Sequence, residues 1–282
     1  MTALLALFSS ALWGGADFIG GTLSRRIHAL AVVGTSQALA LTLIVPLVFV
    51  VGATGDPTGY LPWGIAAGLV GMVSLVAFYA ALAVGTMGVV APIAATGAVV
   101  PVVIGIVQGD RPAPLQLVGV VLAIAGIVLA SGPELRGARE GSAAGVRSLT
   151  LAGLSAVGFG LVLWMLAKGA HYSVAMTLLT QRSASVSAGL LVLLVVRRMG
   201  GLARTDLPQL ALVGAGDVAA NGLYSSASRG GLVSLVAVLG SLYPVVTVLL
   251  ARTVHGERLR TVQNVGVGAA LCGVVLIAAG GV

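Results

Sequence analysis

The sequence has few charged residues and a single cysteine. Asp, Glu, Lys and Arg make up only 8% of the 282 residues, whereas soluble domains contain about 25% charged residues. A soluble protein of this size would also alternate apolar stripes with polar faces, and such alternation is missing. Cys272 lies in an apolar run, which indicates a packing role, and as the only cysteine it excludes a disulfide within the chain. A soluble globular domain is therefore excluded.

Long apolar runs separated by short polar joints dominate the chain. Hydrophobic residues account for 58% of the sequence, and there are 41 glycines. Small residues let membrane helices approach each other closely. The sequence therefore predicts an all-α integral membrane protein that crosses the bilayer many times.

The net charge of +7 would suggest nucleic acid as a partner of a soluble protein. Here the basic residues cluster at the ends of apolar runs, where they set topology and meet anionic lipid headgroups. We therefore expect membrane lipid, and not nucleic acid, as a partner. The first run has no basic leader and ends at Arg25 and Arg26, so it is predicted to be a membrane helix and not a cleaved signal peptide.

A membrane crossing needs about 20 apolar residues, and this length predicts ten transmembrane helices. We place them near 3–23, 30–52, 61–83, 86–108, 115–132, 149–169, 173–196, 208–227, 231–254 and 261–281. The most polar joint divides them into a first repeat (1–132), a connecting loop (133–148) and a second repeat (149–282). Each repeat then contains five helices.

The two halves resemble each other in sequence. The segment GVVAPIAATGAVVP (88–101) aligns with GLVSLVAVLGSLYP (231–244), and GDRPAPLQLVGVVLAIAG (109–126) aligns with GERLRTVQNVGVGAALCG (256–273). Five crossings per half force the second half to enter the bilayer from the opposite side. The prediction is two inverted five-helix repeats, an architecture frequent in secondary transporters. The alternative is a duplication that serves only stability.

On these residues the chain resembles the drug/metabolite transporter superfamily, specifically transporters with two EamA domains. The resemblance rests on the block from ALAVGTMGVVAPIAATGAVVPVVIG through GDRP and Gln116 to Gly119 (81–119), its second copy ending in GERLRTVQNVG (256–266), and the opening ALWGGADF (11–18). Members of this family are mostly exporters of amino acids, other metabolites or drugs, and are often linked to protons. The resemblance implies a transporter without choosing its cargo.

Three ionisable side chains are predicted to lie at membrane depth, namely Asp17, Arg182 and Asp217. A charge at the bilayer centre costs roughly 2.5–3.5 kcal/mol on insertion scales, so these groups should face the bundle interior or a wet cavity. Arg182 and Asp217 lie on consecutive antiparallel helices, and we expect them to form an ion pair. Asp17 is then a candidate proton or cation site. The alternative is that Asp17 pairs with Arg182 as a tie between helices.

Aromatic and amide side chains at similar depth are candidates for the lining of a solute site. Trp13, Tyr79, Asn221 and Tyr224 are favoured because their helices carry the aspartates or are repeat partners of those that do. Such groups can stack on a small molecule or hydrogen-bond to it. The alternative for each residue is a hydrogen bond between helices.

The repeat places neutral residues opposite the charged ones. Gln37 lies near the equivalent of Arg182, and Val162 or its apolar neighbours lie opposite Asp17. An asymmetric charge on a symmetric scaffold suits ligand binding better than scaffold packing.

Pro101 and Pro244 occupy matched positions within predicted helices. A proline removes a backbone donor and frees the carbonyl one turn earlier. Breaks at matched places often mark a central binding site, although they can also be kinks that only shape the bundle.

Basic residues are distributed unequally between the two sides of the predicted bundle. One side holds Arg25, Arg26, Arg136, Arg139, Arg147, Arg197, Arg198, Arg204, Arg252, Arg258 and Arg260, and the other holds Arg111, Lys168 and Arg229. The positive-inside rule then places both termini outside, whereas the family resemblance implies cytoplasmic termini.

One rival function is an intramembrane aspartyl protease. GAGD (214–217) matches the signature of such enzymes, and Asp17 would supply the second carboxylate. Two carboxylates that share a proton can activate water. Against this reading, Asp17 and Asp217 lie 200 residues apart in the sequence, and the Pro-Ala-Leu motif is missing. A non-transporting membrane scaffold is a further alternative.

No metal site or cofactor is predicted. The histidines are far apart at helix ends and form no His-Glu-x-x-His motif; they are His28, His171 and His255.

The function expected from the sequence is therefore secondary active transport by alternating access. We expect export of a small metabolite, amino acid or drug-like compound across the cell membrane, with proton antiport through Asp17. Slim faces formed by Gly119 and Gly126, and by Gly266 and Gly273, could pack within the bundle or form the seam of a homodimer.

Overall fold

The computed structural model describes residues 1–109, 111–139, 143–196, 201–256 and 260–279, and these residues form twelve α-helices. The first half contains α1 (Thr2–Ser24), α2 (Ala29–Val50), α3 (Leu61–Val84), α4 (Met87–Ala95), α5 (Val99–Val107) and α6 (Pro114–Arg139). The second half contains α7 (Ala143–Ala170), α8 (Val174–Val196), α9 (Leu207–Gly230), α10 (Val233–Gly240), α11 (Tyr243–Val254) and α12 (Thr261–Ala279).

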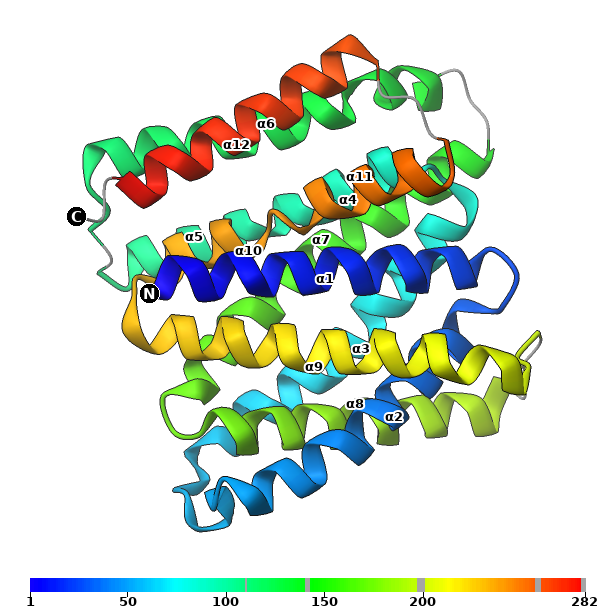
Figure 1. Cartoon of the computed structure of the whole chain (residues 1–282), viewed down its shortest axis with the longest axis vertical. Helices are drawn as coiled ribbons and strands as arrows, with labels where there is room; N and C mark the ends of the chain where they lie inside the picture. Colours follow the sequence, from blue (N-terminus) through cyan, green and yellow to red (C-terminus); the bar gives the residue numbers. More distant parts are fainter. Residues whose placement is uncertain (110, 140–142, 197–200, 257–259, 280–282) are drawn as a thin grey trace.

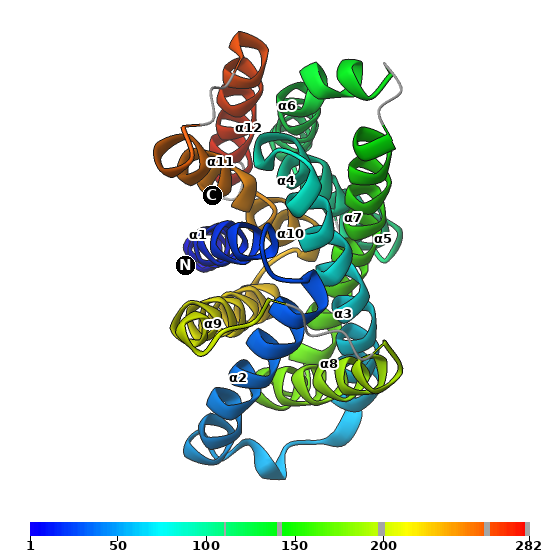
Figure 2. The same ribbon diagram turned by 90° about the vertical axis from the view of Figure 1, so that its right-hand side faces the viewer.

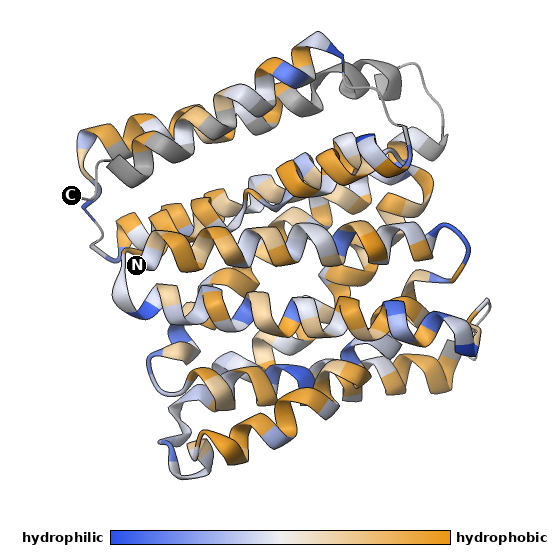
Figure 3. Ribbon diagram, viewed as in Figure 1, coloured by the Kyte–Doolittle hydropathy of each residue, from blue (hydrophilic) through white to orange (hydrophobic). Residues whose placement is uncertain are grey.

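Most of these helices are apolar enough to cross a membrane. Among the described residues, seven stretches satisfy both the length and the hydropathy that a crossing requires. Figure 3 shows that apolar residues predominate along the helices. The helix α9 is not among the seven, and the described part of α6 contributes the shorter apolar stretch Leu117–Gly126. The helical, membrane-spanning fold class is confirmed, and the number of ten crossings stays a prediction.

The predicted connecting loop at 133–148 is largely helical. Helix α6 continues to Arg139 and α7 already begins at Ala143; residues 140–142 lie outside the described part of the chain. The polar composition of this joint suggested a loop. The Glu, Leu, Ala and Arg residues that follow Pro133 have high helix propensity, however, and extend α6 beyond its apolar part.

Two of the predicted helices are broken at matched places. The 3₁₀ turn η3 (Thr96–Ala98) separates α4 from α5, and Ser241 and Leu242 separate α10 from α11. Pro101 and Pro244 follow these breaks closely. Each proline lacks the N–H that would bond to the carbonyl four residues earlier. The predicted interruption of both helices near the matched prolines is therefore confirmed.

The helices of the two halves pack on each other in an exchanged pattern (Figure 2). Helices α1, α2 and α3 of the first half correspond to α7, α8 and α9 of the second. Both α1 and α2 pack against α9, and their counterparts α7 and α8 both pack against α3. The broken helices follow the same rule, with α4 against α11 and α10 against α5, and α6 pairs with α12. The start of α1 and the end of α12 lie on the same side of the bundle (Figure 1).

One glycine of α12, Gly273, serves packing within the chain. A Cβ atom on Gly273 would lie 2.5 Å from the Ala123 nitrogen and 2.6 Å from the Gly119 oxygen, so only glycine lets α12 approach α6 this closely. The slim face that the sequence offered either to the bundle or to a dimer is therefore occupied by α6 at this point.

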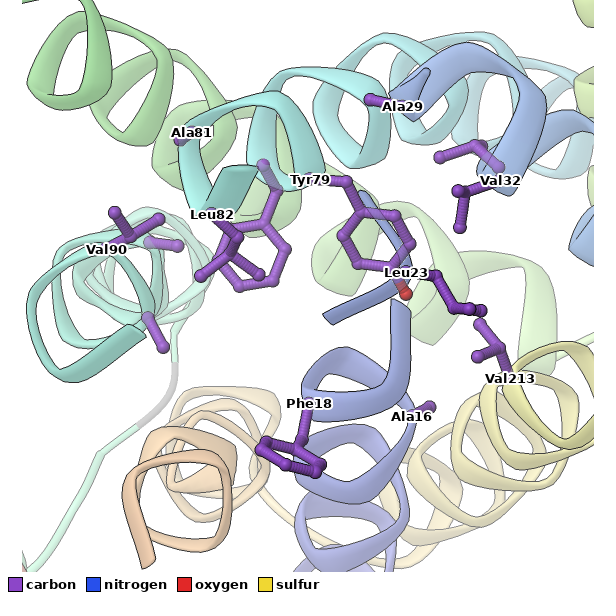
Figure 4. Close-up of a cluster of buried hydrophobic side chains, with 14 of the residues drawn as sticks. Ala16, Phe18, Leu23, Ala29, Val32, Tyr79, Ala81, Leu82, Val90 and Val213 are labelled. Atoms are coloured by element: carbon purple, nitrogen blue, oxygen red, sulfur yellow. The ribbon is translucent and has the colours of Figure 1, made fainter. Parts of the chain in front are cut away.

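A buried apolar cluster joins α3 to α1 and α4 (Figure 4). Tyr79 is 1% exposed, and its ring lies against Gly20 of α1, where a Cβ atom would come within 2.3 Å of the ring. The ring centroid of Phe78 lies 5.9 Å from that of Tyr79, with the two rings tilted, and Phe78 packs edge-on against Phe159. Gly20 thus makes room for a tyrosine one helical turn from Asp17.

An ion pair ties the two halves together at one end of the bundle. Arg26, between α1 and α2, donates to Asp206 at 2.5 Å, and Asp206 is buried in the 3₁₀ turn η4 (Arg204–Asp206) that precedes α9. The Asp206 carboxylate also accepts the Ala203 amide at 3.0 Å. The hydrogen bond from Arg26, followed by that from Ala203, lowers the pKa of Asp206 from its ordinary value.

Asp206→Asn is expected to loosen this joint at neutral pH, because the tie depends on an ionised carboxylate. Hydrogen exchange of the backbone amides of 201–207 should accelerate by roughly two- to fivefold. The control Asp56→Asn, in the joint between α2 and α3, should leave these amides unchanged.

The pH dependence of this tie has a defined sign. Because the fold lowers the pKa of Asp206, the native tie is complete above the ordinary aspartate pKa and is lost as the pH falls through the lowered value. Identical exchange in the native chain and Asp206→Asn at neutral pH would show that the pair does not order the joint.

Candidate functional site

A cavity lies in the middle of the bundle, between the two halves. Its polar lining residues are Trp13, Asp17, Gln37, Gln181, Arg182, Ser185, Asp217, Asn221, Ser241 and Tyr243. Its apolar lining residues are Gly71, Leu75, Ala94, Ala95, Gly97, Ala98, Phe159, Val162, Leu163 and Gly240. Both helix breaks therefore contribute backbone to the wall.

The size of the cavity suits a small solute. It offers about 80 Å³ of space to the centres of water-sized molecules. A single water needs roughly 10–15 Å³ in this measure, so the space exceeds that minimum several times over and can admit a small solute.

Asp217 is the most heavily hydrogen-bonded group of the cavity. Its Oδ1 accepts from Trp13 Nε1 at 3.1 Å and from Asn221 Nδ2 at 2.9 Å. Its Oδ2 accepts from Gln37 Nε2 at 3.0 Å and lies 2.8 Å from Arg182 Nη1. Four donors from four helices thus converge on one carboxylate.

Gln37 bridges Arg182 and Asp217 in addition to their direct ion pair. Its Oε1 accepts a short hydrogen bond from Arg182 Nη1, while its Nε2 donates to Asp217. The amide is 3% exposed and the arginine 2%. The predicted pairing of Asp217 with Arg182 is confirmed, and the alternative in which Arg182 pairs with Asp17 is wrong.

Asp17 lies in the same cavity without a counter-ion. It is 7% exposed, and no ion pair joins it to any residue that the structure describes. The Tyr79 hydroxyl is its side-chain hydrogen-bond partner, and Asp217 is close enough to repel it. A buried carboxylate with one neutral donor and one like charge nearby can bind a proton or a cation.

Five of the seven predicted site residues line the cavity, and two lie behind its wall. Tyr79 reaches Asp17 from outside the lining, and Tyr224 is fully buried with its ring 5.7 Å from that of Trp13. Tyr224 therefore supports Trp13, which in turn donates to Asp217. The sequence identified the helix that carries Tyr224, but not its side of that helix.

Other cavity residues escaped the prediction. Gln37 was noted only as the repeat counterpart of Arg182, to which it bonds in the structure, and Gln181 was not favoured as a site residue. Leu75 and Phe159 carry no polar group, and nothing in the sequence distinguishes them from core residues.

Asp17 and Asp217, the two carboxylates of the alternative protease hypothesis, line the same cavity despite their distance in the sequence. Their surroundings differ from those of two carboxylates that share a proton. Both oxygens of Asp217 already accept two donors each, one of them an arginine. The described residues also contain no group of three His, Cys, Asp or Glu that could hold a metal ion.

The chain resembles known proteins in its fold and in its family. No curated protein matches the chain. One solved structure, described as "Crystal structure of protein", aligns over 98% of this chain and 98% of its own, with a TM-score of 0.78 and 15% sequence identity; at this identity the likeness shows the fold alone. The family model described as "EamA-like transporter family" matches residues 1–132 and 146–279. The chain therefore belongs to the EamA-like transporter family, and it is a multi-pass membrane transporter of the drug/metabolite transporter superfamily.

Proposed function

We propose that the protein is a secondary active transporter that moves a small solute through the central cavity by alternating access. The observation that carries this proposal is the position of the cavity. It lies where both broken helices meet, it is bounded by both halves of the chain, and it holds the buried charges. Broken helices at the interface between repeats are a recurrent setting for solute sites in transporters.

Alternating access requires two packings of nearly equal energy, which an inverted repeat supplies. The exchanged contacts between the halves support such a repeat. So does the direction of the helices in Figure 1: α6 starts on the left and runs to the right, whereas its counterpart α12 starts on the right and ends on the left beside it. In this proposal the chain crosses the membrane ten times.

Proton coupling through Asp17 is part of the proposal. The residue is buried in the cavity wall without a counter-ion, so it can alternate between a neutral and an ionised form as the cavity opens to either side. Export as the direction and the cell membrane as the location rest on the family resemblance. A solute of amino-acid size is favoured by the cavity volume.

Gly71→Phe tests the proposed pathway by filling it. A Cβ atom on Gly71 meets nothing closer than 3.6 Å, so the backbone tolerates a side chain, whose ring then enters the cavity. In proteoliposomes, the flux of labelled amino acids, nucleosides and organic cations should fall to that of protein-free vesicles.

The matched control is Gly15→Phe on α1, where a Cβ atom meets nothing within 4 Å and which does not line the cavity. This variant should retain the native flux. Equal flux in both variants would show that solute does not pass through the cavity, and no flux of any class through the native chain would contradict transport itself. Peptide cleavage that is lost in Asp217→Ala would instead favour the protease.

A further inference from the structure

Arg182 has hydrogen-bonding capacity that the protein itself does not use. Its Nη1 serves both Gln37 and Asp217. Its Nε and Nη2 are buried and have no hydrogen-bond partner among the described residues. A guanidinium carries five N–H donors in a fixed plane, so three of them remain unused beside a cavity that Arg182 lines.

Such an arrangement is costly unless a ligand completes it. A buried donor without an acceptor loses its hydration without gaining a bond, and the cost is larger for a charged group. The arginine is 2% exposed, so bulk water does not satisfy these donors. Buried polar groups without partners therefore point to a group that arrives from outside the chain.

The shape of the unused edge identifies that group. Nε and Nη2 lie side by side in one plane and present parallel N–H bonds, a geometry that matches the two oxygens of a carboxylate. Asp217 pairs with Nη1, so the Nε–Nη2 edge is not committed to it. We infer that the Nε–Nη2 edge of Arg182 binds the carboxylate of the transported solute, an inference that rests on the proposed function.

The other residues that line the cavity indicate what the remainder of this solute contains. Leu75, Phe159 and the Trp13 ring provide apolar contact surface for a small hydrocarbon or aromatic body. Gln181 Oε1 is a buried acceptor without a partner in the described structure, and it lines the same space. A hydrogen-bond donor on the solute, close to its carboxylate, would satisfy this oxygen.

Asp17 separates two kinds of carboxylate solute. Its ionised form repels an anion, and this repulsion is removed either by protonation of Asp17 or by an ammonium group on the solute. A simple carboxylate such as phenylacetate needs the first condition, whereas a zwitterion such as phenylalanine meets the second. Both share the carboxylate that Arg182 is inferred to bind.

Matched acid and amide probes test the inference on the native protein. We would measure the binding of phenylacetate against phenylacetamide, and of phenylalanine against phenylalaninamide, by calorimetry in detergent. In at least one pair the acid should bind roughly ten- to hundredfold more tightly than the amide. The pair that shows this preference tells whether a simple carboxylate or a zwitterion is accepted.

Arg182→Lys removes the inferred contact while keeping the charge beside Asp217. A lysine ammonium can pair with Asp217 but has no second planar edge, so the preference for acid over amide should shrink to about twofold or less. Arg252→Lys, at an exposed position in the last turn of α11, is the matched control and should keep the native preference.

The inference is overturned if the amides bind as tightly as the acids in both pairs, if none of the four probes binds, or if Arg182→Lys folds and retains the native preference. Comparison of the probes on the native protein needs no variant, so it decides the question even if Arg182→Lys does not fold. Flux of phenethylamine without flux of either acid would leave the transporter proposal standing while refuting this one. Absence of flux for every class would refute the proposed function.

Discussion

Asp217→Ala is expected to lower the free energy of unfolding by about 3–5 kcal/mol, the cost of leaving a buried ion without its partner. Arg182 is 2% exposed and would lose its only counter-ion among the described residues. The donors of Trp13, Gln37 and Asn221 would lose an acceptor at the same time. Reversible unfolding in mixed micelles of mild detergent and SDS measures the change.

Two further variants serve as the control and as an intermediate case for this measurement. Asp56→Ala lies in the joint between α2 and α3, and its effect should stay within about 0.5 kcal/mol, as for most surface substitutions. Asp217→Asn retains one acceptor oxygen, so its loss of stability should fall between that of Asp56→Ala and that of Asp217→Ala. If Asp217→Ala unfolds like the native chain, the network around Asp217 does not hold the helices together.

Asp17→Asn is expected to abolish solute movement driven by a pH gradient, while solute exchange without a gradient continues. Asparagine has nearly the same shape as protonated aspartic acid and can still bond to Tyr79, but it cannot release a proton. Accumulation against a concentration gradient in proteoliposomes should therefore fall to the level measured without a pH gradient. Exchange of labelled for unlabelled solute across the same vesicles should remain close to native.

The comparison of the two assays makes this prediction specific to coupling. A variant that merely folds poorly loses both activities together, whereas Asp56→Asn, outside the bundle core, should lose neither. Gradient-driven accumulation that survives intact in Asp17→Asn would remove Asp17 from proton coupling. It would leave the inferred role of Arg182 unaffected, because that role is measured by binding.

Much of the architecture follows from composition and repeat alone. Apolar runs of about 20 residues predict helices because an unbonded backbone is too costly in lipid. The matched prolines predict the breaks before α5 and α11 because the missing N–H is a local property. The joint at 133–148 was predicted wrongly as a loop, because polarity reports exposure to water, whereas propensity decides whether an exposed segment stays helical.

The candidate site was predicted less completely than the fold. The cost of burying charge identified Asp17, Arg182 and Asp217 as residues that must face the interior. Gln37 could have been placed with them, since its repeat counterpart is Arg182 and the exchanged packing brings α2 beside α8. Tyr224 could not be separated from a lining residue, because its direction depends on a small rotation of α9 against α1.

The sequence by itself determined that the chain is a duplicated, membrane-spanning helical protein with three ionisable residues in its apolar helices. These properties depend on composition and spacing along one helix at a time. Between the pairings that the sequence left open, only the tertiary structure decided that Asp217 pairs with Arg182 and that Asp17 has no counter-ion among the described residues. Only the structure, too, showed that one edge of the guanidinium has no partner there. The physical reason is that each partner comes from a different helix, so their distances depend on how the helices rotate and pack, which local sequence does not encode.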